Sequence, residues 1–278
     1  MLKLGYNTNG FAHHRLEDAI ILLGEMGYRS VAITLDYHSL DPYSDSLQSQ
    51  AKRVGELLDQ FQMGSVIETG ARFLLDFHRK HYPTLISDPE GSEKRFDFLR
   101  KSIAIGKILG STSVSFWSGA PDPSRSRKQS MDQLIHYCKN LAMEAEESGI
   151  RLAFEPEPGM LIDTMDAFRE LHEGVNHPFF GLTLDIGHLQ CMGETPIPPF
   201  LHEWKDWLWN IHIEDMRRGI HDHLLFGEGE IDFAPVFQTL QKIRYSGGIH
   251  VELSRHSHNA VETAKKSLEF MNQFLRGS

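Results

Sequence analysis

The regular alternation of strand-like and helix-like segments is the feature of this sequence that most constrains its fold. Leu16–Met26, for example, carries apolar residues at the spacing of an amphipathic helix, and Gly27 follows it as a stop signal. Strands that alternate with helices favour repeated βα units around a parallel sheet. We count eight strands and eight helices, and 278 residues suit one α/β barrel of roughly 250 residues. The sequence therefore predicts an α/β fold, a single (β/α)8 barrel domain spanning residues 1–278.

The expected elements can be placed on the sequence from these patterns. The predicted strands are Leu2–Thr8, Ser30–Thr34, Gly64–Thr69, Ser113–Ser118, Arg151–Glu157, Phe180–Asp185, Asn210–Glu214 and Gly248–Leu253. The predicted helices with clear boundaries are Ser46–Phe61, Glu93–Leu109, Met131–Glu147, Met165–Val175, Phe233–Ile243 and Ala260–Phe274, in addition to the first. A Pro- and Trp-rich connection, Pro196–Trp209, precedes the seventh strand, and we expect it to be exposed and to offer a contact for a homo-oligomer.

Four of the predicted strands end in acidic or histidine side chains. Side chains alternate between the two faces of a strand, and this places Glu155, Asp185, His212 and Glu252 on the inward face. In a barrel of this kind the carboxyl ends of all strands meet at one rim. Three carboxylates gathered there would repel one another without a cation. The set therefore predicts one divalent metal ion, with Mn²⁺, Mg²⁺ or Co²⁺ suited to oxygen-rich ligands and Zn²⁺ or Fe²⁺ also compatible.

The composition narrows the class of partner. With 38 acidic and 28 basic residues the net charge is −10, which disfavours a nucleic-acid partner and favours a small molecule. Cys138 and Cys191 are too few and too far apart for a disulfide framework, and we expect both to be reduced. The chain shows no signal-like start and no apolar run of about 18 residues. We expect a cytoplasmic protein that does not enter a membrane.

Two connections are unusually long for a compact barrel. Gly70–Pro89 carries several basic residues without a helical period, so it either reaches an anionic substrate from the catalytic rim or is a solvated loop. Asp215–Ile231 is the second, and within it His221 and His223 lie close to a Gly-Glu-Gly turn. At its start we expect Glu214 to point inward, and Asp215 to orient a ligand or cap the loop.

Several motifs in the C-terminal half resemble the xylose isomerase-like TIM barrel superfamily, the sugar phosphate isomerase/epimerase family. They are FEP around Glu155, DIGH at Asp185–His188, HIED at His212–Asp215, GEGEIDF at Gly227–Phe233 and VE at Glu252. The resemblance implies one divalent metal held by Glu155, Asp185, His212 and Glu252, a small sugar or sugar-derived polyol as substrate, and an enediolate. Glu155 and Glu252 would then be the catalytic acid and base. His188 and Arg218 would match substrate-contacting positions.

Three further residues are expected to face the substrate. Glu68 and Trp117 lie at the ends of the third and fourth predicted strands, and Glu157 shares the inward face with Glu155. Glu157 is also an alternative ligand to Glu155. The sequence does not choose among epimerisation, isomerisation and dehydration, because all three begin with removal of a proton next to a carbonyl.

A second branch of the superfamily suggests an alternative. His188, His221 and His223 resemble the histidine positions of the trinuclear-zinc apurinic endonucleases, which implies a possible second metal ion and phosphoester hydrolysis. That branch has histidines where this chain has Glu68 and Trp117, so a full trinuclear cluster is not expected. The same three histidines are compatible with substrate binding alone. A catalytically silent barrel that binds a sugar also stays open.

Overall fold

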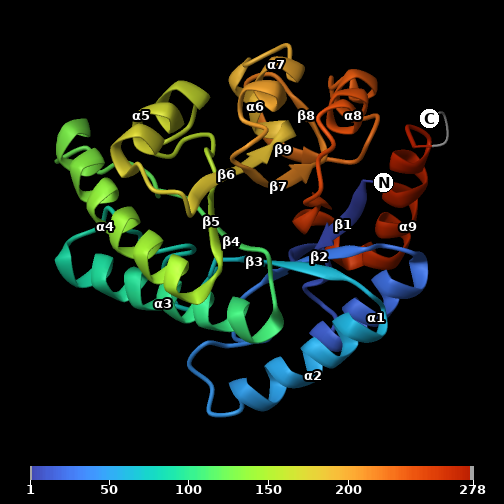
Figure 1. Cartoon of the computed structure of the whole chain (residues 1–278), viewed down its shortest axis with the longest axis horizontal. Helices are drawn as coiled ribbons and strands as arrows, with labels where there is room; N and C mark the ends of the chain where they lie inside the picture. Colours follow the sequence, from blue (N-terminus) through green and yellow to red (C-terminus); the bar gives the residue numbers. More distant parts are fainter. Residues whose placement is uncertain (1, 276–278) are drawn as a thin grey trace.

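The computed structural model describes residues 2–275, within which eight parallel strands form a closed barrel (Figure 1). The order around the barrel is β1-β10-β7-β6-β5-β4-β3-β2. The barrel strands are β1 (Lys3–Asn7), β2 (Ser30–Thr34), β3 (Gly64–Glu68), β4 (Ser113–Phe116), β5 (Arg151–Phe154), β6 (Phe180–Asp185), β7 (Leu208–Ile213) and β10 (Gly248–Val251). The predicted (β/α)8 barrel is confirmed.

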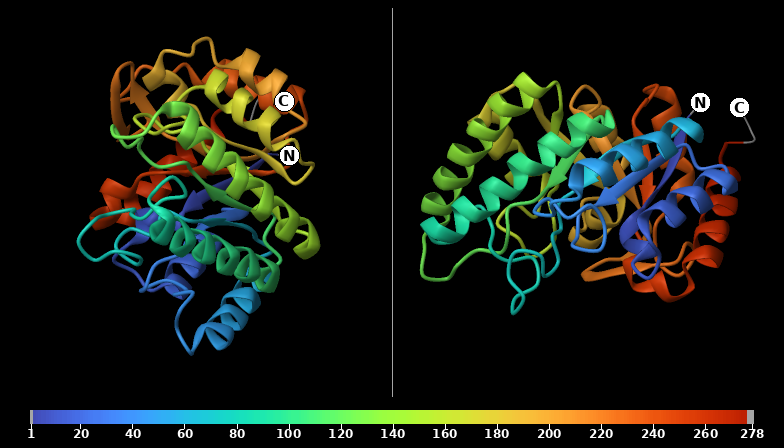
Figure 2. Two further views of the ribbon diagram at one scale, coloured as in Figure 1. Left: turned by 90° about the vertical axis from the view of Figure 1, so that its left-hand side faces the viewer. Right: turned by 90° about the horizontal axis from the view of Figure 1, so that it is seen from below.

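Helices cover the outside of the barrel (Figures 1 and 2). They are α1 (Leu16–Met26), α2 (Leu47–Gln60), α3 (Pro89–Leu109), α4 (Arg127–Ser148), α5 (Met165–Val175), α6 (Ile186–Met192), α7 (Pro198–Glu203), α8 (Phe233–Lys242) and α9 (Ala260–Asn272), with short 3-10 helices η1 (Thr8–Phe11) and η2 (Ser254–Asn259). Residues 2–275 include no helix that is long and apolar enough to span a membrane.

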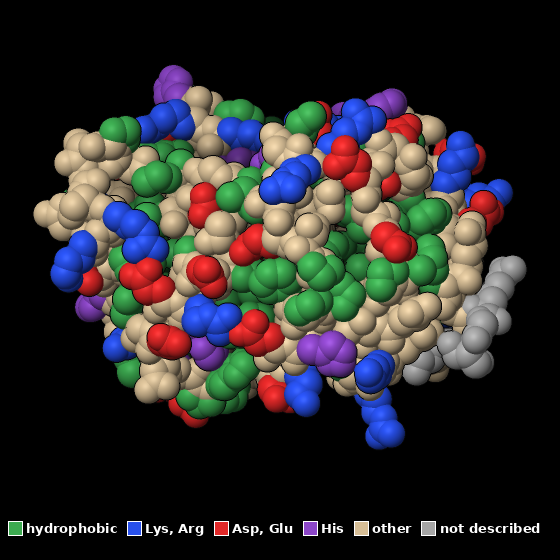
Figure 3. Space-filling model, turned by 90° about the horizontal axis from the view of Figure 1, so that it is seen from above, with side chains coloured by type: hydrophobic (Ala, Val, Ile, Leu, Met, Phe, Trp, Pro, Cys, Tyr) green, Lys and Arg blue, Asp and Glu red, His purple; other side chains and the backbone are tan. Residues whose placement is uncertain are grey.

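Burial follows the layers of this architecture. Every residue of β2 and β6 is buried, as expected for strands that lie between a filled barrel interior and a layer of helices. Apolar side chains such as Leu182 and Leu184 of β6 join the core, whereas Thr183 and Asp185 alternate with them on the polar inner face. On the outer face shown in Figure 3, acidic and basic side chains are interspersed among apolar ones. The side chains of the candidate site lie on this polar inner face.

Two helices begin earlier than their apolar periodicity predicts. Helix α3 begins at Pro89, because the side chain of Asp88 accepts a hydrogen bond from the backbone N–H of Gly91. Helix α4 begins at Arg127 behind a capping box formed by Ser126 and Gln129. In both helices the first turn is polar, so the apolar periodicity used for the prediction does not include it.

The Pro- and Trp-rich connection is not the exposed segment that the sequence suggested. It contains one helix, α7, and both Trp204 and Trp209 are buried within the chain. The ring of Trp204 packs edge-on against Phe168 of α5, with 4.9 Å between ring centroids. The expectation of an exposed, tryptophan-rich contact for a second subunit is therefore wrong for these two side chains.

The second long connection forms a two-stranded antiparallel hairpin, β8 (Asp215–Arg217) with β9 (Ile220–Leu224). Asp215 closes this loop onto the barrel: its Oδ2 accepts from the backbone N–H of Gly227 at 2.8 Å, and its Oδ1 accepts from that of Ile231 at 3.2 Å. The prediction that Asp215 caps the loop is confirmed. In the right-hand view of Figure 2, the hairpin and the loop before α3 project from the same end of the barrel.

Candidate metal centre and active site

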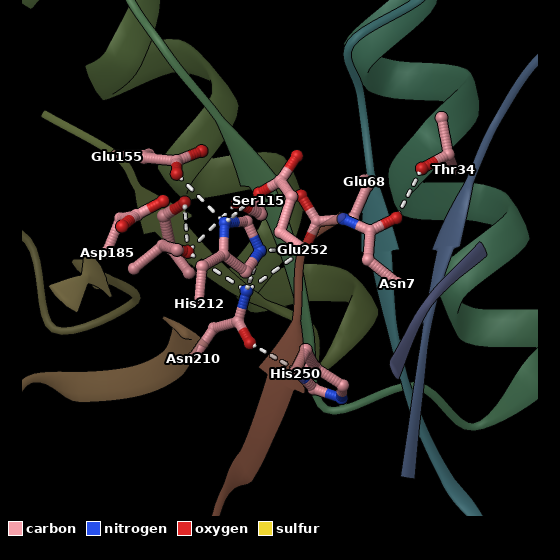
Figure 4. Close-up of polar contacts among 12 residues, drawn as sticks. Asn7, Thr34, Glu68, Ser115, Glu155, Asp185, Asn210, His212, His250 and Glu252 are labelled. Atoms are coloured by element: carbon pink, nitrogen blue, oxygen red, sulfur yellow. Dashed lines mark hydrogen bonds and ion pairs between the residues drawn. The ribbon is translucent and has the colours of Figure 1, made fainter. Parts of the chain in front are cut away.

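The four expected ligands meet at the carboxyl end of the barrel. Glu155 follows β5, Asp185 ends β6, His212 lies in β7 and Glu252 follows β10. One ligand atom from each of the four side chains lies within 4.8 Å of the others. Glu155, Asp185 and His212 are buried and Glu252 is partly buried. The strand tips therefore form one compact cluster, as Figure 4 shows.

His212 lies at the centre of this cluster. Its Nδ1 is 2.9 Å from Glu155 Oε1 and 2.8 Å from Glu252 Oε2. Burial by itself lowers the pKa of His212, but Glu155, Glu68 and Glu252 together raise that pKa well above its ordinary value. Without a metal, a proton on this imidazole balances part of the carboxylate charge.

The far nitrogen of His212 is held by a buried hydrogen-bonded chain that crosses the barrel interior (Figure 4). His212 Nε2 lies 2.8 Å from Glu68 Oε1, which also accepts from Asn210 Nδ2 at 3.0 Å. Asn210 Oδ1 lies 2.7 Å from His250 Nδ1, and His250 Nε2 lies 2.8 Å from the hydroxyl of Ser30. Glu68 therefore directs the imidazole so that Nδ1 faces the other ligands.

The donor set fits a divalent cation. Asp185 Oδ2 is buried and makes no hydrogen bond to any of residues 2–275, so a coordination position is free on this carboxylate. Burial raises the pKa of Glu155 well above its usual range, although His212 opposes this effect. For Glu252, burial also favours the neutral form, but the charge and hydrogen bond of His212 hold its pKa below the usual value. Three carboxylates and one imidazole suit Mn²⁺, Mg²⁺, Co²⁺ or Zn²⁺.

Three of the four ligands, Glu155, His212 and Glu252, line a cavity of 520 Å³. The cavity is lined by residues that the sequence singled out, namely Glu68, Trp117, Glu155, Glu157, His188, His212, His221, His223 and Glu252. Burial raises the pKa of Glu157 to about 7. A volume of this size lies within the range of small-molecule sites.

The loop before α3 contributes basic groups to the same cavity. Arg72, Lys80 and His81 line it, and Arg72 is also 3.6 Å from Asp36 in an ion pair. Burial lowers the pKa of His81 to about 4. The structure places these three basic residues at the cavity, and their contact with an anionic substrate stays a prediction.

The three histidines of the expected second site come together. His188 Nε2 and His221 Nε2 are 3.1 Å apart, and His188 Nδ1 is 3.1 Å from the carbonyl oxygen of Pro156. The ring centroids of His221 and His223 are 5.3 Å apart. Burial lowers the pKa of His188 to about 4, whereas Glu214 raises that of His223 to about 10 against the effect of burial.

One expected substrate contact lies elsewhere, and several contributors were not foreseen. Arg218 is exposed at the turn of the β8–β9 hairpin, packs over Gly193, and is not among the described residues that line the cavity. Asn9 donates from Nδ2 to Glu252 Oε1 at 2.7 Å, and Arg255 also lines the cavity. Asn9 follows β1 and Arg255 follows β10. Their position just after a strand end is the only sequence signal that could have placed them at this rim.

This chain matches a known protein family and resembles curated proteins of that kind. The family model described as "Xylose isomerase-like TIM barrel" matches residues 14–274. Among curated proteins, the L-ribulose-5-phosphate 3-epimerase UlaE of Salmonella paratyphi A is 26% identical over 219 residues, which cover 73% of this chain and 72% of that protein.

Solved structures share the same architecture. D-allulose 3-epimerase from Methylomonas sp., solved in complex with D-allulose, superposes with a TM-score of 0.75 at 20% identity and covers 98% of this chain and 96% of its own. The IOLI protein, solved with a bound zinc atom, gives a TM-score of 0.74 at 20% identity, with 96% of each chain covered. At these identities the likeness concerns the fold.

Proposed function

Because this chain belongs to the xylose isomerase-like TIM barrel family, we propose that it is a divalent-metal-dependent epimerase of a small sugar. The observation that carries the proposal is the convergence of Glu155, Asp185, His212 and Glu252, the first, third and fourth of which line a small-molecule cavity. Relatives named as 3-epimerases of ribulose 5-phosphate and allulose support inversion at the carbon beside a ketone.

The metal and the protein groups have separate roles in this proposal. A divalent ion bound to the four ligands would act as a Lewis acid. It would make the hydrogen on the hydroxyl-bearing carbon next to the carbonyl more acidic and would favour the enediolate. Glu155 and Glu252 approach from β5 and β10, which β6 and β7 separate in the barrel. One carboxylate removes the proton from one face of the carbon, and the other returns a proton to the opposite face. The reverse reaction exchanges their roles.

Other residues orient these groups and the sugar. Asn9 fixes Glu252 Oε1 by its hydrogen bond, and Glu68 fixes the ring of His212. Trp117 offers an apolar wall, while Glu157 and His188 offer polar contacts for sugar hydroxyls. Lys80 and Arg72 at the cavity supply positive charge for a phosphorylated substrate.

The direct test is solvent exchange at the inverted carbon. Metal-loaded protein should convert one member of a panel of free and phosphorylated ketoses into its 3-epimer in D₂O and incorporate deuterium at that carbon, as followed by NMR. Glu252→Gln should abolish both signals, whereas Glu170→Gln, which changes an exposed glutamate of α5, should retain them. Turnover by Glu252→Gln would refute the acid–base assignment. Tight sugar binding without exchange would indicate a silent binding barrel.

A second candidate function is phosphoester hydrolysis, and the cluster of His188, His221 and His223 favours it. Its test is release of inorganic phosphate from phosphomonoesters, and cleavage of abasic-site DNA, by the zinc-loaded protein. Release of phosphate, or cleavage of the DNA, without any deuterium incorporation into ketoses would replace the epimerase proposal with this one.

A further inference from the structure

Beside the metal centre, three charged side chains meet, and each carries a buried polar atom that makes no hydrogen bond to any of residues 2–275. Asp185 ends β6, Glu214 follows β7, and His223 lies in β9 of the hairpin. One ligand atom from each lies within 4.8 Å of the other two. The elements that carry them are distant in the sequence, and the hairpin brings them together.

Glu214 is the most unusual of the three. Its exposed fraction is 0%, and neither carboxylate oxygen makes a hydrogen bond to any residue in the described range 2–275. His223 Nδ1 lies 3.7 Å from Glu214 Oε1, beyond hydrogen-bond distance, and is itself unpartnered within those residues. Asp185 Oδ2 is the fourth such atom, with His188 Nε2 at 3.3 Å. His223 can offset part of the charge of Glu214 at 3.7 Å. The oxygens of Glu214 still make no hydrogen bond within residues 2–275, which is costly for a buried carboxylate, so these atoms point to a missing cation.

The backbone leaves room for this arrangement. Gly187, in the first turn of α6, lies against Glu214, and a Cβ atom there would collide with Glu214 Oε1. A glycine at this position therefore lets the carboxylate approach Asp185 and His223.

The alternative set of three histidines is less suited to a second cation. Both ring nitrogens of His188 already have partners, in His221 and in the carbonyl of Pro156. That set also contains no negative charge, whereas Asp185 and Glu214 match a dication. Carboxylate oxygens and imidazole nitrogens both bind Zn²⁺, and three protein ligands leave the fourth position for water.

We propose that Asp185, Glu214 and His223 bind a second divalent cation, so that Asp185 is shared with the first centre. The proposal extends the proposed function and rests on it only through Asp185. Because Glu214 and Asp185 belong to the barrel and His223 to the hairpin, the cation would fasten the β8–β9 hairpin to the rim.

Metal stoichiometry tests this site. The protein is stripped with chelator, reloaded with Zn²⁺, desalted and measured by elemental analysis, with circular dichroism as a check on folding. Wild type should retain two ions per chain and Glu214→Gln one. His221→Ala is the matched control, because it removes a neighbouring histidine of the same strand, and it should retain two. Glu155→Ala should lose the first ion and keep the second.

The outcomes separate this proposal from the proposed function. One ion in wild type that Glu214→Gln retains, two ions in Glu214→Gln, or a loss in His221→Ala would overturn the second site as assigned. A wild type with one ion that Glu214→Gln loses and Glu155→Ala keeps would support this site and refute the first centre, and with it the metal-dependent epimerase.

A second measurement needs no variant. Hydrogen exchange of the backbone amides of residues 215–224 is compared in wild type loaded with one and with two equivalents of Zn²⁺. The second equivalent should slow exchange in the hairpin by about tenfold or more, since opening the hairpin would require loss of the ion. Unchanged exchange in the hairpin would contradict the proposal.

Discussion

Two clusters of acidic and histidine side chains lie side by side at the carboxyl end of this barrel, and their polar atoms are satisfied in different ways. Around His212, both ring nitrogens have carboxylate partners, and a chain through Glu68 and Asn210 continues to His250. Around Glu214, both carboxylate oxygens lack a hydrogen bond within residues 2–275. The first cluster is preorganised by the protein itself, whereas the second depends on something that binds. The hydrogen bonding of buried polar groups thus distinguishes a site that the protein preorganises from one that its ligand completes.

The largest expected difference between the clusters is in catalysis. Glu252→Gln should lower kcat by about 10²–10⁴-fold, because it removes a proton-transfer group. Glu214→Gln should have a much smaller effect, since Glu214 is not among the described residues lining the cavity. Steady-state kinetics on the substrate found by the panel measures both. Equal losses in the two variants would break the functional distinction between the clusters.

Metal affinity should reveal the contribution of Glu68. Glu68→Gln keeps the shape of the side chain but removes the charge beside His212 Nε2, and it should weaken binding of the first ion by about 10–100-fold. Ser115→Ala, which removes a hydroxyl that accepts from Thr183 at the same depth, is the control and should leave the affinity unchanged. Titration against a chelator of known affinity provides the measurement. An unchanged affinity in Glu68→Gln would show that the charge of Glu68 does not assist binding.

In the metal-free protein, the two clusters should respond to apolar substitution with opposite signs. Glu214→Met should raise the free energy of unfolding by about 1–3 kcal/mol, because it removes a buried carboxylate that makes no hydrogen bond within residues 2–275. Glu68→Leu should lower it by about 1–3 kcal/mol, because Asn210 and His212 lose their acceptor. Urea denaturation in the presence of chelator checks both values. A loss of stability in Glu214→Met would show that Glu214 is already compensated without metal.

The pH dependence of metal binding should follow the proton on His212. The pKa of this group is raised above its ordinary value, so in the metal-free protein the imidazole stays protonated at neutral pH. A cation must displace that proton, and affinity for the first ion should therefore increase with pH, by about tenfold per unit between pH 6 and 8. Calorimetry in buffers of different ionisation enthalpy would count the protons released. A flat profile would show that His212 is neutral before the metal binds.

The strand tips could be predicted from sequence because the rule behind them is local. Alternation along a strand fixes which side chains share a face, and the barrel brings the ends of all strands to one rim. Glu155, Asp185, His212 and Glu252 therefore follow from four short segments. The same rule placed Glu68 and Trp117 at the cavity.

Contacts between distant segments could not be predicted in this way. The bond between Glu68 and His212 joins β3 to β7 across the barrel interior, and no local pattern encodes which inward side chains meet there. Arg218 does not reach the cavity because the segment that contains it pairs as the β8–β9 hairpin, with Arg218 at the turn. Helix α4 began early because a capping box, not an apolar stripe, sets its first turn. Each of these differences arises from hydrogen bonding rather than from hydrophobic periodicity.

Anomalous diffraction from crystals of the chelator-stripped protein reloaded with Zn²⁺ would test the central claim most directly. The account predicts a strong peak bounded by Glu155, Asp185, His212 and Glu252. A peak elsewhere alone, or no peak at this cluster under conditions where the protein retains zinc in solution, would contradict the assignment of these four residues as the metal centre.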